Sequence, residues 1–154
     1  MGPSGPVLSG ATARVVEALG GELPAPALYG ILKLRAEVFV VEQDCAYLDP
    51  DGRDLEPSTR HLWVEDETGT VVAALRVLAE ADGATSIGRV VTAPSHRSRG
   101  LAAQLVGAAM AGAARPVRIN AQSHLVEWYG RFGFTVAGAE FVEDGIPHTP
   151  MVAA

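Results

Sequence analysis

The sequence predicts an α+β fold in which helices pack against both faces of one mixed sheet. Three observations lead to this prediction. β-branched runs bounded by Gly, Pro and Asp alternate with apolar stripes of helical spacing. The expected elements form a group of early strands, then strand, helix, strand and helix, then two final strands. A short basic turn, residues 97–100, joins one strand to the next helix. This order is typical of a layered α+β domain.

The bulk composition indicates one folded domain. The chain has 154 residues, 48% of them hydrophobic, a mean hydropathy of +0.18 and a net charge of −6. No apolar run is long enough to span a bilayer, residues 1–8 lack the features of a secretory signal, and the acidic balance argues against a general nucleic-acid binder. The single cysteine, Cys45, excludes an intramolecular disulfide and fits a reducing compartment. We therefore expect a cytoplasmic monomer or homodimer with no membrane or nucleic-acid partner, a loose leader over residues 1–12 and one domain over residues 13–154.

The first half of the chain is predicted to hold a strand, a helix and two further strands. Residues 13–19 are expected to form a short strand, and two prolines, Pro24 and Pro26, mark the entry to a helix. That helix is predicted from an apolar stripe with one charge in it, made of Leu28, Ile31, Leu32, Arg35, Val38 and Phe39. Residues 61–65 and 70–79 are expected to be two strands, with Thr68-Gly69 as the hairpin turn between them.

The second half is predicted to alternate strands with helices and to end in a hairpin. Strands are expected over residues 85–92 and 117–120, with a helix rich in Ala and Gly between them. A second helical face follows, in which Leu125, Trp128, Tyr129 and Phe132 lie at i, i+3, i+4 and i+7. The last two strands, residues 134–142 and 147–152, are expected to close around the turn Asp144-Gly145.

Two charged features have structural interpretations. Asp49, Asp51 and Asp54 are spaced like the opening of a calcium loop, but Arg60 stands where the bidentate Glu would be needed. We therefore expect a solvated turn there, and no metal, because no Cys/His set has zinc spacing either. Arg35 lies within an apolar helix face. It is expected to form a buried ion pair, with Glu42 as the candidate partner; contact with a substrate is the alternative.

The basic turn indicates an anion-binding site. The first N–H groups of a helix have no intrahelical partner and lie at the positive end of its dipole, and Arg97 and Arg99 add cationic side chains. The sequence holds neither a Walker loop nor the Gly-x-Gly-x-x-Gly fingerprint of dinucleotide-binding folds. The turn therefore predicts a phosphate or pyrophosphate cradle of another kind.

That turn is similar to a motif of the GNAT superfamily of N-acetyltransferases. Arg97-Ser98-Arg99-Gly100-Leu101-Ala102 resembles the pattern Arg/Gln-x-x-Gly-x-Gly/Ala, although Ser98 stands where many members have Gly. Further segments resemble the ElaA-type branch: residues 34–43, 59–61, 120–124, 129–134 and 143–148. The resemblance extends from about residue 13 to the end. It implies the GNAT fold, a mixed and mostly antiparallel sheet with helices on both faces and a splayed parallel strand pair.

The resemblance implies an acyltransferase that uses acetyl-CoA as cosubstrate. Its pantetheine arm would lie between the strands 85–92 and 117–120, and its pyrophosphate on the turn. The residues implied in donor binding are Val91, Thr92, Ala93, Arg97, Ser98, Arg99, Gly100, Leu101, Ala102, Asn120 and Tyr129. Tyr129 matches the Tyr that faces the sulfur, so it is the candidate general acid, and packing in the helix face is the alternative. Two other functions remain open, a non-catalytic acyl-CoA-binding module and an enzyme like the acyl-homoserine-lactone synthases. A module of the first kind would not need the acid.

The acceptor and the general base are less defined by the sequence. The strand 85–92 carries Arg89 and no carboxylate, so a carboxylate base is not expected there. Candidate bases elsewhere are Glu42, His61, His124, Asp144 and His148, of which Glu42 and His148 are the catalytic candidates. A water chain linking several of these groups is an alternative. We expect His61, Asp144 and His148 to bind the acceptor, a primary amine of a small molecule or peptide.

Overall fold

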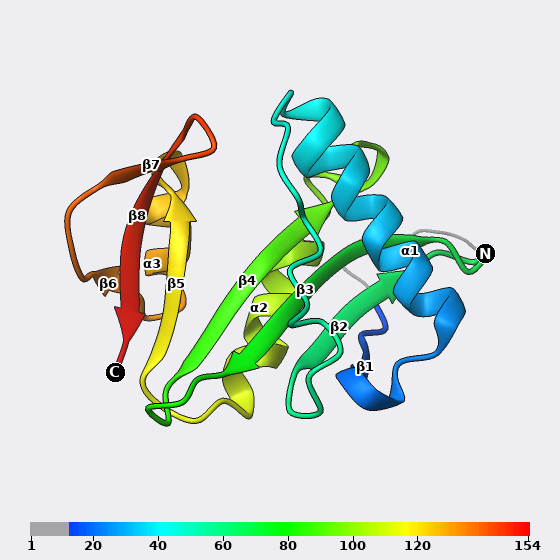
Figure 1. Ribbon diagram of the computed structural model, residues 1–154, viewed down its shortest axis with the longest axis horizontal. Coiled ribbons are helices and arrows are strands. Elements are labelled where there is room, and N and C mark those ends of the chain that lie inside the picture. Colours follow the sequence, from blue (N-terminus) through cyan, green and yellow to red (C-terminus); the bar gives the residue numbers. More distant parts are fainter. Residues whose placement is uncertain (1–12) are drawn as a thin grey trace.

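The computed structural model describes residues 13–154, and its centre is an eight-stranded sheet (Figure 1). The predicted leader, residues 1–12, lies outside the described residues. The strand order is β1-β2-β3-β4-β5-β8-β6, with β7 paired to β8. Only β4 and β5 run parallel, and every other described pair is antiparallel. The predicted α+β class with a mixed, mostly antiparallel sheet is confirmed.

The strands occupy the predicted regions, with shifts of a few residues at their ends. Their bounds are β1 Val16–Leu19, β2 Arg60–Glu65, β3 Val71–Ala79, β4 Thr85–Thr92, β5 Val117–Gln122, β6 Thr135–Val136, β7 Phe141–Glu143 and β8 Ile146–Ala153. The strand predicted over residues 134–142 is interrupted, because β6 and β7 pair with different parts of β8. The turn between β7 and β8 is the predicted Asp144-Gly145. Both residues have positive φ, 52° and 77°, as a two-residue type I′ hairpin turn requires.

Helices cover both faces of this sheet. Helix α1, Ala25–Arg35, lies on one face and continues as a π-helix, Ala36–Glu42, whose wider turns are often found at functional sites. Helices α2, Leu101–Ala111, and α3, Val126–Gly130, lie on the other face (Figure 1). Three short 3₁₀ turns complete the helical elements: Gly20–Glu22, Pro94–His96 and Ser123–Leu125. None of the helices in residues 13–154 is long and apolar enough to cross a bilayer.

The core has two parts, one on each face of the sheet. The larger part packs α2 and α3 against the strands through fully buried residues such as Leu105, Val106 and Val117. The smaller part packs α1 through Ile31, Leu34 and neighbours on β2 and β3. Helix α3 is shorter than the stripe from Leu125 to Phe132 predicted. Its aromatic side chains still pack on one face of the sheet, because the 3₁₀ turn Ser123–Leu125 and the short helix α3 that follows it place them there.

Strands β4 and β5 separate soon after they begin. Their ladder holds only the pairs Thr85↔Val117 and Ser86↔Arg118, so the rest of each strand faces a gap. Between the pairs Ala74↔Val91 and Arg76↔Gly88, β4 has one residue more than β3, and Arg89 within this bulge has a φ of 54°. A bulge bends its strand, and this one lies where β4 leaves β5. The splayed parallel pair implied by the sequence resemblance is present.

Candidate functional site

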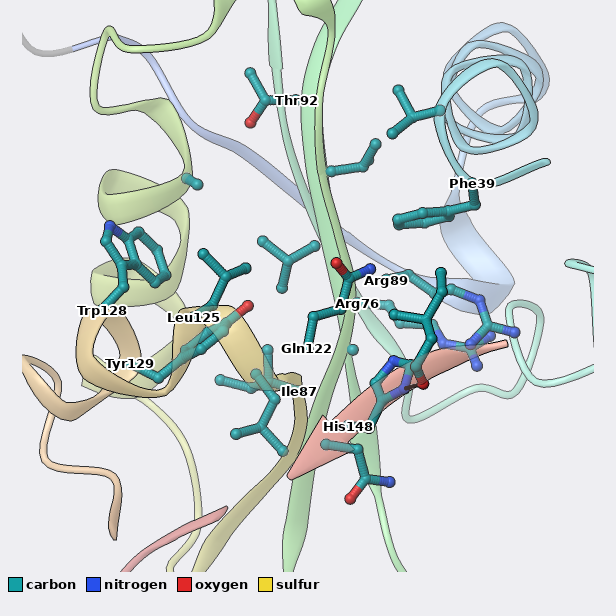
Figure 2. Close-up of a pocket in the computed structure, with 18 of the residues that line it drawn as sticks. Phe39, Arg76, Ile87, Arg89, Thr92, Gln122, Leu125, Trp128, Tyr129 and His148 are labelled. Atoms are coloured by element: carbon teal, nitrogen blue, oxygen red, sulfur yellow. Dashed lines mark hydrogen bonds between the residues drawn. The ribbon is translucent and has the colours of Figure 1, made fainter. Parts of the chain in front are cut away.

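A pocket of about 1240 Å³ occupies the gap between the separated strands. Its wall runs from the loop before α2, past the exposed backbone of β4 and β5, to the β7–β8 hairpin. Helix α3 supplies Trp128 and Tyr129 on one side, and the π-helix supplies Phe39 on the other (Figure 2). The pocket is therefore lined from both faces of the sheet, and the N-terminus of α2 forms part of its wall.

The loop before α2 has the geometry of an anion cradle. Ser98 and Gly100 both have left-handed φ angles, 65° and 77°, and Gly100 is the N-cap residue with no side-chain cap. The first N–H groups of α2 are thus left without a side-chain acceptor at the pocket wall. Five of the six motif residues line the pocket: Arg97, Ser98, Gly100, Leu101 and Ala102. Arg99 does not line it, so the structure gives no support to the expected contact of Arg99 with a phosphate.

Arg97 is already engaged by a carboxylate. Its two terminal guanidinium nitrogens donate to the two carboxylate oxygens of Glu42, both at 2.6 Å, and its Nε donates to the Thr92 carbonyl at 3.3 Å. The hydrogen bonds of Arg97 hold the pKa of Glu42 below its usual range. Glu42 does not line the pocket, and an ionised carboxylate bound to a guanidinium is a poor proton acceptor. The expectation that Glu42 acts as a base is therefore not supported by this arrangement.

The slot between the strands is lined by most of the residues expected to contact pantetheine. Val91, Thr92 and Asn120 line the pocket. Ala93 does not, because its N–H donates to the Val72 carbonyl at 2.8 Å and is turned into the sheet. Beyond Ser86, the β5-facing edge of β4 has no partner strand in the described ladder. An extended amide-containing chain can therefore add along this edge as a strand would.

Tyr129 combines a buried ring with a hydroxyl at the pocket. The residue is 5% exposed, and its ring contacts Trp128 and Phe134 edge to face, with centroid separations of 4.9 and 6.1 Å. The hydroxyl points toward the centre of the pocket (Figure 2) and has no hydrogen-bond partner among residues 13–154. Burial raises the pKa of Tyr129 to about 12. The phenol is therefore protonated and free to donate.

His148 faces the same pocket from β8. Its Nδ1 lies 2.8 Å from the Ile146 carbonyl, which can only accept, so Nδ1 carries the hydrogen. In the neutral ring, Nε2 then holds the lone pair and can accept a proton. The ring of Phe141 stacks on the imidazole, with 5.8 Å between the ring centroids, and fixes the plane of the imidazole. Gln122, the ladder partner of His148, lies beside it at the pocket wall (Figure 2).

The other predicted acceptor and base residues are divided between the pocket and the core. Asp144 lines the pocket at the tip of the hairpin, and its carbonyl accepts from the Cys45 thiol at 3.0 Å. His124 also lines the pocket. His61 does not, since it is fully buried in β2 and its Nε2 donates to the Asp54 carbonyl at 2.8 Å. The expectation that His61 binds the acceptor is therefore wrong for this conformation, because no ligand in the pocket can reach it.

The acidic turn is a largely buried ionic cluster, with Asp51 and Arg89 at its exposed edge, rather than a solvated turn. Three guanidinium groups alternate with three carboxylates in this arginine–aspartate cluster, whose members are Arg35, Arg76, Arg89, Asp49, Asp51 and Asp54. Arg35 is 1% exposed and donates to Asp49 at 2.8 Å and to Asp54 at 2.7 Å. The expected buried ion pair of Arg35 is thus present. The proposed partner, Glu42, was wrong, because Glu42 points to Arg97.

The cluster holds the irregular residues 43–59 against the sheet. Arg89 joins this loop to the β4 bulge, with its Nε 2.9 Å from an Asp49 oxygen and its Nη2 donating to the Asp49 carbonyl at 2.9 Å. Left-handed φ in a non-glycine residue costs about 1–3 kcal/mol, and such contacts are what can maintain it. The loop thereby brings Tyr47 and Leu48 to the pocket. Neither residue was predicted from the sequence; the signal that could have indicated them is a long loop rich in turn residues, since such loops are often functional.

The buried His61 and the aspartates of the cluster predict acid-sensitive stability. Burial lowers the pKa of His61 below 6.5, so the folded state stays neutral while the unfolded state takes up a proton as pH falls through about 6.5. Hydrogen bonding to Arg76 holds the pKa of Asp51 below 3.8. Burial alone would raise the pKa of Asp54, but the hydrogen bonds and charges of Arg35 and Arg76 outweigh burial and lower this pKa below 3.8 as well. Stability should therefore decrease below about pH 6.5, and again below about pH 4.

Urea unfolding at pH 8, 7, 6 and 5 measures the first of these decreases. The His61→Gln variant keeps a side-chain donor for the Asp54 carbonyl and should flatten the dependence between pH 7 and 5. His124→Gln removes an exposed histidine and serves as the control. A wild-type urea midpoint that does not change from pH 7 to pH 5 would contradict this interpretation of His61.

Comparison with known proteins agrees with the geometry. Residues 37–154 match the model of the acetyltransferase (GNAT) domain. Protein ElaA of Escherichia coli is 39% identical over 139 residues, which cover 84% of this chain and 89% of ElaA. A UPF0039 protein of Mycobacterium tuberculosis is 47% identical over 135 residues, which cover 85% of this chain and 86% of that protein.

Solved structures show the same fold. An acyl-CoA N-acyltransferase from Pseudomonas aeruginosa is 40% identical, with a TM-score of 0.85, and the match covers 92% of this chain and 99% of that one. The crystal structure of Escherichia coli ElaA is 33% identical, with the same TM-score of 0.85, over 93% of this chain and 100% of that one. The chain belongs to the GNAT family of acetyltransferases, in its ElaA-type branch.

Proposed function

We propose that this protein transfers an acetyl group from acetyl-CoA to a primary amine of a small molecule or peptide, in one ternary complex. The observation that carries the proposal is the continuity of the pocket. A single cavity joins the cradle before α2 to the Tyr129 hydroxyl and the His148 imidazole, through the gap between β4 and β5. Donor and acceptor can thus meet from opposite ends without a covalent enzyme intermediate.

The donor is expected to lie along β4. The cradle N–H groups and Arg97 suit a pyrophosphate, and the edge of β4 beyond Ser86 suits the amides of pantetheine. A backbone N–H near Val91 would then polarise the thioester carbonyl, as in an oxyanion hole. Asn120, exposed at the opposite wall, is placed to contact the same arm. The expectation of a metal-free site stays a prediction; residues 13–154 hold no arrangement of His, Cys, Asp and Glu suited to an ion.

The chemical step needs one base and one acid. The neutral amine nitrogen attacks the thioester carbonyl carbon, and its surplus proton passes to Nε2 of His148. The C–S bond then breaks, and the departing thiolate takes the proton of the Tyr129 hydroxyl. The products are an amide and free CoA, and the two residues exchange protons with water afterwards. His148 and Tyr129 lie on different walls of the pocket, as these two roles require (Figure 2).

The acceptor is expected to be cationic before it reacts. Glu143 and Asp144 line the hairpin end of the pocket, and neither carboxylate has a cationic partner among the described residues. By contrast, the carboxylates near Arg76 and Arg89 are paired within the arginine–aspartate cluster. The unpaired carboxylates would attract an ammonium group, which must then lose its proton.

The test of the function is thiol release from acetyl-CoA over a panel of amines, amino acids, polyamines and peptides. An acceptor that produces both CoA and a mass increase of one acetyl group supports the proposal. A protein that binds CoA but releases no thiol with any acceptor would instead be a binding module, the alternative considered from the sequence.

Replacing His148 with Gln is expected to lower the turnover about 10²-fold, near the lower end for loss of a positioned base, because water can partly replace it. In the wild type, turnover should increase with pH as the amine loses its proton. It should then stay level to about pH 10, because Tyr129, with a pKa of about 12, remains protonated. The variant should keep the CoA affinity and lose turnover throughout this range. A variant with near-normal turnover would remove His148 from the base role.

A further inference from the structure

Glu42 forms an ion pair with Arg97, the first residue of the cradle motif and part of the pocket wall. The pair joins residues 55 positions apart through two parallel hydrogen bonds of 2.6 Å. A third bond runs from Nε to the Thr92 carbonyl at 3.3 Å. Each side chain is 42% exposed, so a ligand at the cradle can reach the pair. The fork of Arg97 that faces a phosphate in the proposed function is thus occupied by a carboxylate.

The local sequence gives Glu42 no other role. It is the last residue of the π-helix Ala36–Glu42, and an acidic side chain at a helix C-terminus is disfavoured by the dipole. Its neighbour Glu37 pairs along the helix with Lys33, but Glu42 has Arg97 as its cation. The position of Glu42 is therefore explained by the cradle and not by its own helix.

A carboxylate and a phosphate bind a guanidinium fork in the same bidentate way. The terminal nitrogens of Arg97 cannot bind the Glu42 carboxylate and a phosphate in this way at the same time. An ion pair exposed to water contributes little to stability, whereas a pyrophosphate also meets the free N–H groups of α2. The phosphate can therefore displace the carboxylate. The displaced Glu42 then leaves a negative charge beside the ligand.

We propose that Glu42 is an internal competitor of the donor's phosphate groups for Arg97, and that it sets the affinity of the enzyme for CoA and its thioesters. Glu42 holds Arg97 in the empty site, yields it when a phosphate-bearing donor enters, and takes it back as CoA leaves. The inference rests on the proposed use of acetyl-CoA, and it assigns to Glu42 a role in donor affinity that replaces the role of base.

The Glu42→Gln variant tests the competition. Calorimetric titration with CoA, at about 0.1 M salt, is expected to give a Kd about three- to tenfold lower than that of the wild type, because a competitor and a repelling charge are both removed. Glu37→Gln makes the same charge change on the same π-helix, outside the pocket, and should leave the Kd within about twofold. In the Arg97→Gln background, Glu42→Gln should lower the Kd for CoA by a clearly smaller factor.

A truncated donor gives a second control. Acetyl-pantetheine has no phosphate, so its kcat/KM should be the same for the wild type and for the Glu42→Gln variant, while the KM of the variant for acetyl-CoA falls. If the wild type binds CoA and Glu42→Gln binds it equally or more weakly, Glu42 orients Arg97 instead and the inference is overturned. If the wild type does not bind CoA at millimolar concentration, the proposed function itself fails.

Discussion

Replacing Tyr129 with Phe is expected to lower the turnover by about 10²–10⁴-fold, the range for loss of a positioned proton donor. The physical reason is the position of the hydroxyl. It points into the pocket, has no protein partner among residues 13–154, and is kept protonated by a pKa of about 12. Removing it leaves the departing thiolate without an acid. The ring contacts with Trp128 and Phe134 are retained, so the fold and the CoA affinity should change little.

Single-turnover kinetics with saturating acetyl-CoA measures this effect, because product release then cannot mask the chemical step. Tyr29→Phe provides the matched control, since Tyr29 is 74% exposed and lies outside the pocket. A Tyr129→Phe enzyme with a near-normal single-turnover rate would return Tyr129 to a packing role only.

Replacing Gly100 with Val is expected to abolish the stabilisation of the protein by CoA. A ligand at a hundred times its Kd adds about 2.7 kcal/mol to stability. For a domain of this size, that corresponds to an increase in Tm of about 5–11 °C. Gly100 lines the pocket at a φ of 77°, and no protein atom lies within 4 Å of where its Cβ would be. The Val side chain would therefore occupy the space of the phosphate and not collide with the protein.

The control for this variant must reproduce its backbone strain. Gly69 also has a left-handed φ, 84°, and open space at its Cβ, but it lies in the β2–β3 turn away from the pocket. Gly69→Val should lower the Tm of the free protein as Gly100→Val does, and it should keep the increase with CoA. If Gly100→Val keeps the full increase as well, the phosphate does not bind at this loop.

The proposals for Glu42 and for Tyr129 can be separated by experiment. The first concerns donor affinity and is measured by Kd at equilibrium, with no acceptor present. The second concerns the rate of the chemical step with the donor already saturating. An enzyme in which both effects occur would have its pyrophosphate site and its acid at opposite ends of one donor-binding slot, as the pocket lining suggests.

Local pattern was sufficient for most of the fold. The strand segments before Gly69 and Gly83, the stripe from Leu101 to Ala109 and the turn at Asp144-Gly145 each fix backbone conformation over a few residues. The cradle was predictable for the same reason, because its geometry follows from a strand, a left-handed turn and a helix that are neighbours in sequence. The sequence by itself therefore determined the α+β class, the element order and the loop expected to bind phosphate.

The tertiary structure decided which charged groups meet. Arg35 pairs with Asp49 and Asp54, and Glu42 with Arg97, over separations that no helical or strand period connects. His61 was expected at a substrate and is instead fully buried. Long flexible side chains choose partners by proximity in space and by the cost of leaving a charge unpaired in the core. That choice is made only when the loop 43–59, the β4 bulge and the helices have packed together.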